Sequence, residues 1–279
     1  MRSPEQIKGK VRNIAKEKSL KPQEVLQIYM FERIIERVSV SQYHDNVILK
    51  GGLLISSMIG IGERTTMDMD TTIQGLSMEE GNILHIYKEI LGIDVGDGIQ
   101  FIINDIGPIM EDDVYSNFRI SLTASYGKMN IPMKIDITTG DVITPGKIEY
   151  KYPFMFDDVC VNVMAYPLET ILAEKFETII RRNVGNTRGR DFYDLYMLYK
   201  LRENEIRWDV LRQAVLATSA KRYSVNDMSS YEEIVNEMKQ SDFLKRIWNK
   251  YKNENTYIGD LSLDNVFDIV MIFGRRMAL

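Results

Sequence analysis

The feature that most constrains the fold of this chain is a change of hydrophobic period near Tyr166. Before it, short runs rich in β-branched and aromatic residues alternate apolar and polar positions between Gly, Asp, Asn and Pro, which is typical of strands. After Pro167, apolar residues recur every three or four positions, which is typical of helices. We therefore predict a mixed α/β (α+β) domain over residues 1–166 and a helical domain over residues 167–279.

The coarse pattern assigns elements by residue range. Strands are predicted at 47–50, 69–73, 99–103, 118–124, 129–137 and 159–164. Helices are predicted at 4–18, 22–38, 53–60, 79–92, 168–183, 189–202, 207–222 and 231–253, with a loop at 224–231.

Composition excludes several kinds of site. The chain has one cysteine, Cys160, and two histidines, so no disulfide framework, zinc cluster or Cys/His catalytic pair can form within it. A bound metal would use oxygen ligands. The charged N-terminus and the lack of a long apolar run predict a cytoplasmic protein with no membrane partner.

Two aspartates follow a glycine-rich apolar segment at an unusual place. Asp68 and Asp70 stand one residue apart in "TMDMDTTI", and in a strand both would face the same side, roughly 7 Å apart. Hard divalent ions such as Mg²⁺ are held by one or two carboxylates together with substrate phosphates, so this pair is a candidate metal clamp. The alternative is two solvated aspartates on an edge strand or turn.

A third carboxylate lies in "IPMKIDITTG", where alternation places Lys134 and Asp136 on the polar side of the strand. If this strand neighbours the first, Asp68, Asp70 and Asp136 form a cluster that could hold two metal ions for in-line phosphoryl or nucleotidyl displacement. Lys134 could instead be an ordinary surface lysine.

A glycine pair lies between a predicted strand and a predicted helix. At Gly51 and Gly52 the absence of Cβ lets phosphate oxygens approach backbone N–H groups, and a helix N-terminus favours an anion. Alternatively, the two glycines form a tight turn that binds no ligand.

Charged residues in the helical part lie on apolar faces. Lys175 lies on the side of its helix that carries Leu168, and Asp191 shares a side with apolar residues of the next helix, with Asp194 one turn further. A buried Lys–Asp pair joining two helices would account for them, whereas Arg188 and its neighbouring arginines could instead bind a triphosphate or an RNA backbone.

Taken together, these motifs resemble those of the AbiEii family of nucleotidyltransferase-fold toxins from AbiE-type abortive-infection systems. The family's "KGG" turn is matched by Lys50-Gly51-Gly52, and its R-[ST]-x-D-x-D strand by the residues from Arg64 to Asp70. Its K-x-D-I, A-E-K and R-x-x-D-x-x-D-L motifs are similar to 134–137, 173–175 and 188–195, in the same order along the chain.

The resemblance implies a nucleotidyltransferase-like mixed sheet with flanking helices plus a C-terminal helical domain that contributes Lys175 and Asp191 to the site. It implies a metal-dependent toxin that uses Mg²⁺ or Mn²⁺ and transfers a nucleotide from a nucleoside triphosphate, GTP or a pyrimidine triphosphate, to RNA such as tRNA. A cognate antitoxin that acts without a stable complex is also implied.

The resemblance also implies a role for each matched residue. Asp68 and Asp70 would hold the metal on the triphosphate, and Asp136 would join a second metal and help to activate the acceptor hydroxyl. The predicted catalytic residues are Asp68, Asp70, Asp136, Lys175 and Asp191, the predicted metal ligands are the first three of these, and the predicted nucleotide-binding residues are Gly51, Gly52, Arg64, Thr66, Lys134, Arg188 and Asp194.

Two other functions fit parts of the pattern. A nucleotidyltransferase or phosphotransferase acting on a small molecule or a protein side chain would show metal-dependent transfer without RNA. A non-catalytic protein that binds RNA or a partner would keep its phenotype when the carboxylates are substituted.

Overall fold

The computed structural model describes residues 3–109 and 117–279, which divide into two compact units. The first unit comprises Met1–Asp141 and Ile148–Ala165, and the second comprises Val142–Lys147 and Tyr166–Leu279. The short segment Val142–Lys147 belongs to the second unit, although the sequence pattern had grouped it with the first. None of the helices in the described residues combines the length and hydrophobicity needed to cross a membrane.

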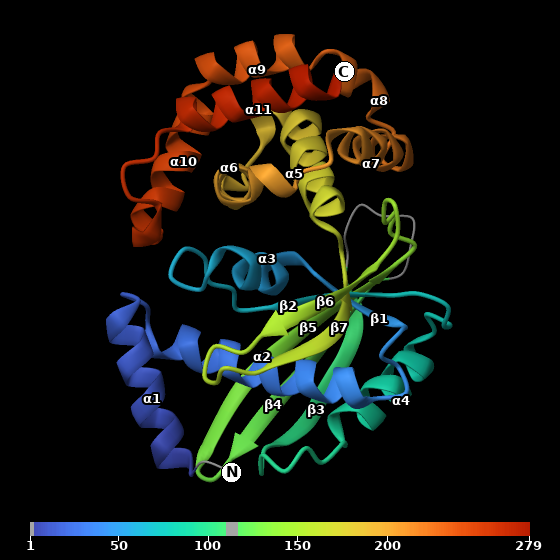
Figure 1. Ribbon diagram of the computed structural model, residues 1–279, viewed down its shortest axis with the longest axis vertical. Helices are drawn as coiled ribbons and strands as arrows, with labels where there is room; N and C mark the ends of the chain where they lie inside the picture. The colour runs from blue at the N-terminus through green and yellow to red at the C-terminus, as the bar shows by residue number, and fades with distance from the viewer. Residues whose placement is uncertain (1–2, 110–116) are drawn as a thin grey trace. The chain divides into compact units, whose positions relative to one another are not determined.

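The first unit is a seven-stranded mixed sheet with helices (Figure 1), in the strand order β3-β4-β5-β2-β1-β7-β6. Its elements are α1 (Pro4–Glu17), α2 (Pro22–Val40), β1 (Val47–Lys50), α3 (Gly51–Ile59), β2 (Met69–Ile73), α4 (Glu80–Leu91), β3 (Gln100–Ile109), β4 (Asn117–Tyr126), β5 (Met129–Thr139), β6 (Ile148–Pro153) and β7 (Cys160–Ala165). The predicted mixed α/β class with a nucleotidyltransferase-like sheet is confirmed.

Three pairings of the central strands place the polar residues. β2 runs antiparallel to β1 and parallel to β5, and β4 runs antiparallel to β5. The predicted alternation of β5 is confirmed, because Met133, Ile135 and Ile137 are buried in the core. On the same face of β2, the Thr71 hydroxyl lies 2.7 Å from the hydroxyl of Tyr87, so this face of the sheet is turned toward α4.

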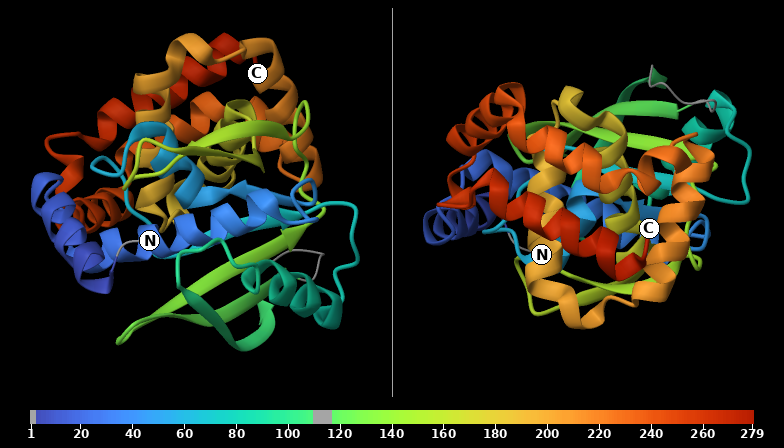
Figure 2. Two further views of the ribbon diagram at one scale, coloured as in Figure 1. Left: turned by 60° about the horizontal axis from the view of Figure 1, so that its bottom comes forward. Right: turned by 90° about the horizontal axis from the view of Figure 1, so that it is seen from above.

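The second unit is helical in the residues that the structure describes (Figure 2). Its elements are α5 (Leu168–Arg182), η1 (Asn183–Gly185), α6 (Gly189–Arg202), η2 (Glu203–Glu205), α7 (Trp208–Lys221), α8 (Val225–Ser229), α9 (Tyr231–Gln240), α10 (Asp242–Glu254), η3 (Thr256–Ile258) and α11 (Leu263–Met277). Aromatic side chains fill its core, with Phe273 stacked on Phe176 and edge-on to Tyr199 and Trp208.

Several sequence-based element predictions are wrong. Strand β6 was not predicted, because charges break its apolar run and Pro153 ends it. The single helix predicted at 231–253 is two helices, since Ser241 ends α9 and caps α10 by accepting from the Leu244 amide. Residues expected to form a loop after Ser224 include α8, and α11 was not predicted.

Candidate active site

A row of charged residues crosses four neighbouring strands of the first unit. Lys50 on β1 pairs in register with Asp70 on β2, Asp70 with Asp136 on β5, and Asp136 with Arg119 on β4. Residues in direct register point to the same side of a sheet, so the four side chains share one face, opposite to the buried face. We call this row of Lys50, Asp70, Asp136 and Arg119 the charged row.

The glycine turn begins α3 directly beside Asp70. Gly51 has φ +64°, a conformation that favours glycine, and a Cβ there would collide with the Asp70 carboxylate. The Gly52 amide donates to Asp70 Oδ2 at 3.2 Å. The structure therefore brings Gly51, Gly52 and Asp70 together, and the Gly52 amide at the start of the helix faces a carboxylate.

Arg64 and Thr66 lie beneath this turn. Arg64 is buried, and its Nη1 donates to the Thr65 carbonyl at 2.6 Å. A Cβ on Gly52 would lie 2.7 Å from both Arg64 Nη1 and Thr66 Oγ1, so only glycine fits between them without displacing either residue. Thr66 is also buried and donates to the Asp68 carbonyl at 3.1 Å. Both side chains hold the turn and the approach to Asp68 in place.

Asp68 precedes β2 rather than lying within it, because the strand begins at Met69. Strand alternation therefore does not determine which way the Asp68 side chain points. Its carboxylate is nevertheless near the other two: burial, then the charges of Asp136 and Asp70, raise the pKa of the Asp68 carboxyl, while the charges of Arg119 and Lys134 act in the opposite direction.

Asp136 is bound by an arginine that the sequence-based site did not include. Arg119 Nε and Nη2 donate to Asp136 Oδ1 and Oδ2, each at 2.7 Å, in a bidentate pair. Lys134 is exposed and pairs in register with Ser121 on β4. Its contribution to the site is the positive charge that it places near Asp68.

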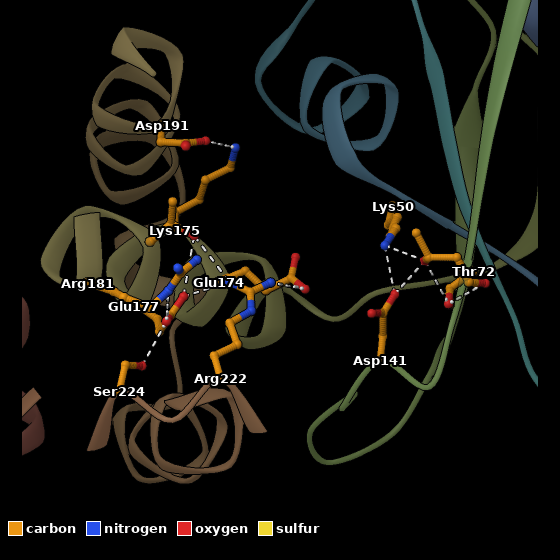
Figure 3. Close-up of polar contacts among 12 residues, drawn as sticks. Lys50, Thr72, Asp141, Glu174, Lys175, Glu177, Arg181, Asp191, Arg222 and Ser224 are labelled. Atoms are coloured by element: carbon orange, nitrogen blue, oxygen red, sulfur yellow. Dashed lines mark hydrogen bonds and ion pairs between the residues drawn. The ribbon is translucent and has the colours of Figure 1, made fainter. Parts of the chain in front are cut away.

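Lys50 leads to a second polar network on the sheet (Figure 3). Its ammonium donates to Thr138 Oγ1 at 2.6 Å and to Asp141 Oδ2 at 2.7 Å, and Thr138 Oγ1 donates to the same Asp141 oxygen at 2.7 Å. Thr138 also lies 3.1 Å from Thr72 Oγ1. The network fixes the end of β5 against β1 and β2.

The second unit holds the other predicted charges in one cluster. Lys175 Nζ lies 2.6 Å from Asp191 Oδ1 and 3.0 Å from Asp194 Oδ2, and Figure 3 shows Lys175 on α5 reaching Asp191 on α6. Arg188 Nε lies 3.2 Å from Asp191 Oδ2. That contact lacks hydrogen-bond geometry, so Asp191 Oδ2 is buried without a hydrogen-bond partner. The predicted Lys–Asp pair between two helices is thus present.

Glu177 anchors α5 below Lys175 (Figure 3). It is fully buried and accepts from Arg181 Nε at 2.7 Å, Arg222 Nη1 at 2.6 Å and Ser224 Oγ at 2.8 Å. Because two guanidinium groups and a hydroxyl surround the carboxylate, they compensate the cost of burying its negative charge.

The comparison with protein families decides the identity of the chain. The model of the family described as nucleotidyl transferase AbiEii toxin, type IV toxin–antitoxin system, matches residues 33–268. This chain belongs to the AbiEii family. The AbiEii protein is therefore a nucleotidyltransferase toxin of a type IV toxin–antitoxin system, a class that implies a nucleoside triphosphate substrate and an antitoxin.

Solved structures support the fold of this AbiEii protein. JHP933 from Helicobacter pylori superposes with a TM-score of 0.52 at 15% sequence identity, covering 93% of this chain and 95% of that one. A second H. pylori structure, provisionally named a nucleotidyltransferase, gives a TM-score of 0.52 at 16% identity, with 93% and 98% covered. No curated protein matches the chain in sequence.

The carboxylates of the AbiEii protein fit one hard cation better than two. Asp68 and Asp70 are neighbouring carboxylates of like charge. Burial, and then the charges of Asp136 and Asp70, raise the pKa of the Asp68 carboxyl, and a bound divalent cation would offset the repulsion among these carboxylates. Asp136 differs because Arg119 already binds both of its oxygens. Within residues 3–109 and 117–279, no group of three or more His, Cys, Asp or Glu side chains is placed to hold a metal ion.

Sequence reasoning missed Arg119, Thr138 and Asp141 as neighbours of the AbiEii site. Alternation in "NFRISLTASY" does place Arg119 on the polar side of its strand. It gives no sign of which strand lies beside it, and that pairing is what brings the guanidinium to Asp136.

Proposed function

We propose that this toxin transfers a nucleotide from a nucleoside triphosphate, GTP or a pyrimidine triphosphate, to an RNA acceptor such as tRNA, with Mg²⁺ or Mn²⁺ bound by Asp68 and Asp70. The observation that carries the proposal is the Asp70 carboxylate at the Gly51–Gly52 turn, with Asp68 close enough for their charges to interact, in a member of the AbiEii family. A bound divalent cation would supply charge neutralisation at the triphosphate.

The residues of the first unit bind and orient the triphosphate. In this proposal the backbone amides at the start of α3 bind phosphate oxygens, and Arg64 and Thr66 pack against Gly52 from below. Lys134 and Arg119 add positive charge on the same side as Asp68. Most of the rate enhancement then comes from positioning and charge neutralisation.

The transfer itself is a displacement at the α-phosphorus. The acceptor hydroxyl oxygen forms a new bond to this phosphorus, and the bond to the bridging oxygen breaks. Pyrophosphate leaves with the electron pair, and the hydroxyl proton is released to solvent. We also propose that Lys175 contacts a phosphate during this step and that Asp191 orients its ammonium, with Arg188 and Asp194 supporting the pair.

The test is a labelling experiment. Purified protein is incubated with Mg²⁺, total tRNA and each α-labelled nucleoside triphosphate in turn, alongside Asp68→Asn and the matched control Asp158→Asn, whose aspartate is exposed in the same unit. We expect label in RNA from one nucleotide, a loss of about 10²–10³-fold in rate in Asp68→Asn, and an unchanged rate in the control.

Two results would overturn parts of the proposal. Equal rates in Asp68→Asn and the wild type would remove Asp68 from the site. Label in protein or in a small molecule, with none in RNA, would identify a different acceptor class and leave the nucleotidyl transfer intact.

A further inference from the structure

The third carboxylate of the site is engaged by a partner that competes with a metal ion. In a centre with three carboxylates and two cations, Asp136 would give an oxygen to a metal. Here both of its oxygens accept charge-assisted hydrogen bonds from one guanidinium at 2.7 Å. A second cation at Asp136 would have to share these oxygens with the guanidinium and would meet its positive charge at close range.

The backbone fixes this arrangement. Arg119 and Asp136 are direct partners in the antiparallel ladder between β4 and β5, with Phe118 paired to Ile137 on one side and Ile120 paired to Ile135 on the other. These flanking side chains are buried on the opposite face, so a slip of register would expose them. The two strands therefore hold Arg119 at Asp136 independently of any ligand.

The charges also balance with a single divalent cation. The Arg119 guanidinium neutralises the carboxylate of Asp136, which leaves Asp68 and Asp70 as the two carboxylates for one divalent cation. A guanidinium remains protonated at any physiological pH, so its contribution is permanent, and its planar fork matches a carboxylate. The side chain of Arg119 is 40% exposed, so its charge also acts on a polyanion bound at this face.

We propose that Arg119 takes the place and the charge of a second metal ion at Asp136, so that this site binds one divalent cation, held by Asp68 and Asp70. The inference rests on the proposed function, since it assumes that Asp68 and Asp70 hold a cation. It makes Arg119 a positioning residue that neutralises Asp136.

The test counts metal ions rather than turnover. Mn²⁺ is titrated into the purified full chain, free Mn²⁺ is measured by electron paramagnetic resonance, and the bound spectrum is inspected for the broadening that two neighbouring Mn²⁺ ions cause. We expect one Mn²⁺ per wild-type chain without coupling, one in Asp136→Asn, and none in Asp68→Asn.

The arginine variants decide the assignment. Arg119→Met should free Asp136 and raise the count to two with coupled spins, and the double variant Arg119→Met/Asp136→Asn should return it to one. Lys134→Met is the matched control, because it removes a positive charge near Asp68 without touching Asp136, and it should keep the count at one. Circular dichroism verifies that each variant is folded.

The outcomes separate the inference from the proposed function. Two coupled ions in the wild type, reduced to one in Asp136→Asn, would overturn the inference and leave the metal-dependent transfer standing. A count that stays at one in Arg119→Met would also overturn it. No bound Mn²⁺ in the wild type would overturn the metal assignment in the proposed function as well.

Discussion

Replacing Lys175 by methionine tests how much the charged cluster of the second unit contributes to stability. Methionine keeps much of the length and apolar character of the side chain but removes the ammonium. Lys175 lies 2.6 Å from Asp191 and 3.0 Å from Asp194, and the carboxylates are 4% and 0% exposed. The substitution therefore takes a counterion from two buried carboxylates at once.

The magnitude follows from the burial of the partners. Removing one partner of a buried ion pair costs about 3–5 kcal/mol, because the remaining charge stays out of water. Arg188 still lies 3.2 Å from Asp191 Oδ2 in the variant, which reduces the loss. We therefore expect the free energy of unfolding of the second unit to fall by about 3 kcal/mol, at the lower end of that range.

The assay can follow this unit alone, because both tryptophans, Trp208 and Trp248, lie in it. Urea unfolding is followed by tryptophan fluorescence for the wild type, Lys175→Met and the control Lys239→Met. Lys239 makes an exposed ion pair with Asp268 at 3.3 Å, and its loss should cost about 0–1 kcal/mol. Adding Asp191→Asn and Asp194→Asn to Lys175→Met should recover part of the lost stability.

Two results would contradict this role of the Lys175 ion pairs. If Lys175→Met loses no more stability than Lys239→Met, the two short ion pairs do not stabilise the packing of α5 on α6. If the added asparagines bring no recovery, uncompensated carboxylate charge is not the cause of the loss.

Two further predictions concern stability. Burial raises the pKa of Glu32 from 4.5 to about 8, so between these values the folded state binds a proton that the unfolded state lacks, and stability falls by roughly 1.4 kcal/mol per pH unit. Glu32→Gln keeps an acceptor for the Met155 amide. Its urea midpoint, followed by circular dichroism, should therefore rise relative to that of the wild type as the pH increases from 5 to 8. A constant difference between the two midpoints over this range would contradict the prediction. Gly274→Ala would place a Cβ inside the buried ring of Tyr231 and should lower the free energy of unfolding by about 1–3 kcal/mol in the fluorescence assay. Gly185→Ala is the control, because nothing lies within 4 Å of a Cβ there. Equal stability of the two variants would refute the prediction.

The sequence by itself determined the features that depend on neighbours along the chain. The change of period near Tyr166 predicted a mixed α/β part before it and a helical part after it, and alternation predicted that Lys134 and Asp136 face away from the core. The strand, Gly-Gly turn and helix around Gly51 were also predictable from the sequence, because the φ of +64° there favours glycine. These are local properties of the backbone and of side-chain periodicity.

Only the tertiary structure decided which strands are neighbours and which side chains are covered. Parallel pairing of β2 with β5 sets Asp70 beside Asp136, and antiparallel pairing of β4 with β5 gives Asp136 its arginine. Arg64, which the sequence-based analysis predicted to bind the nucleotide, is buried against the start of α3. Strand order and burial depend on contacts between residues far apart in the chain, and a hydrophobic pattern with a period of two residues carries no information about the partner of each strand.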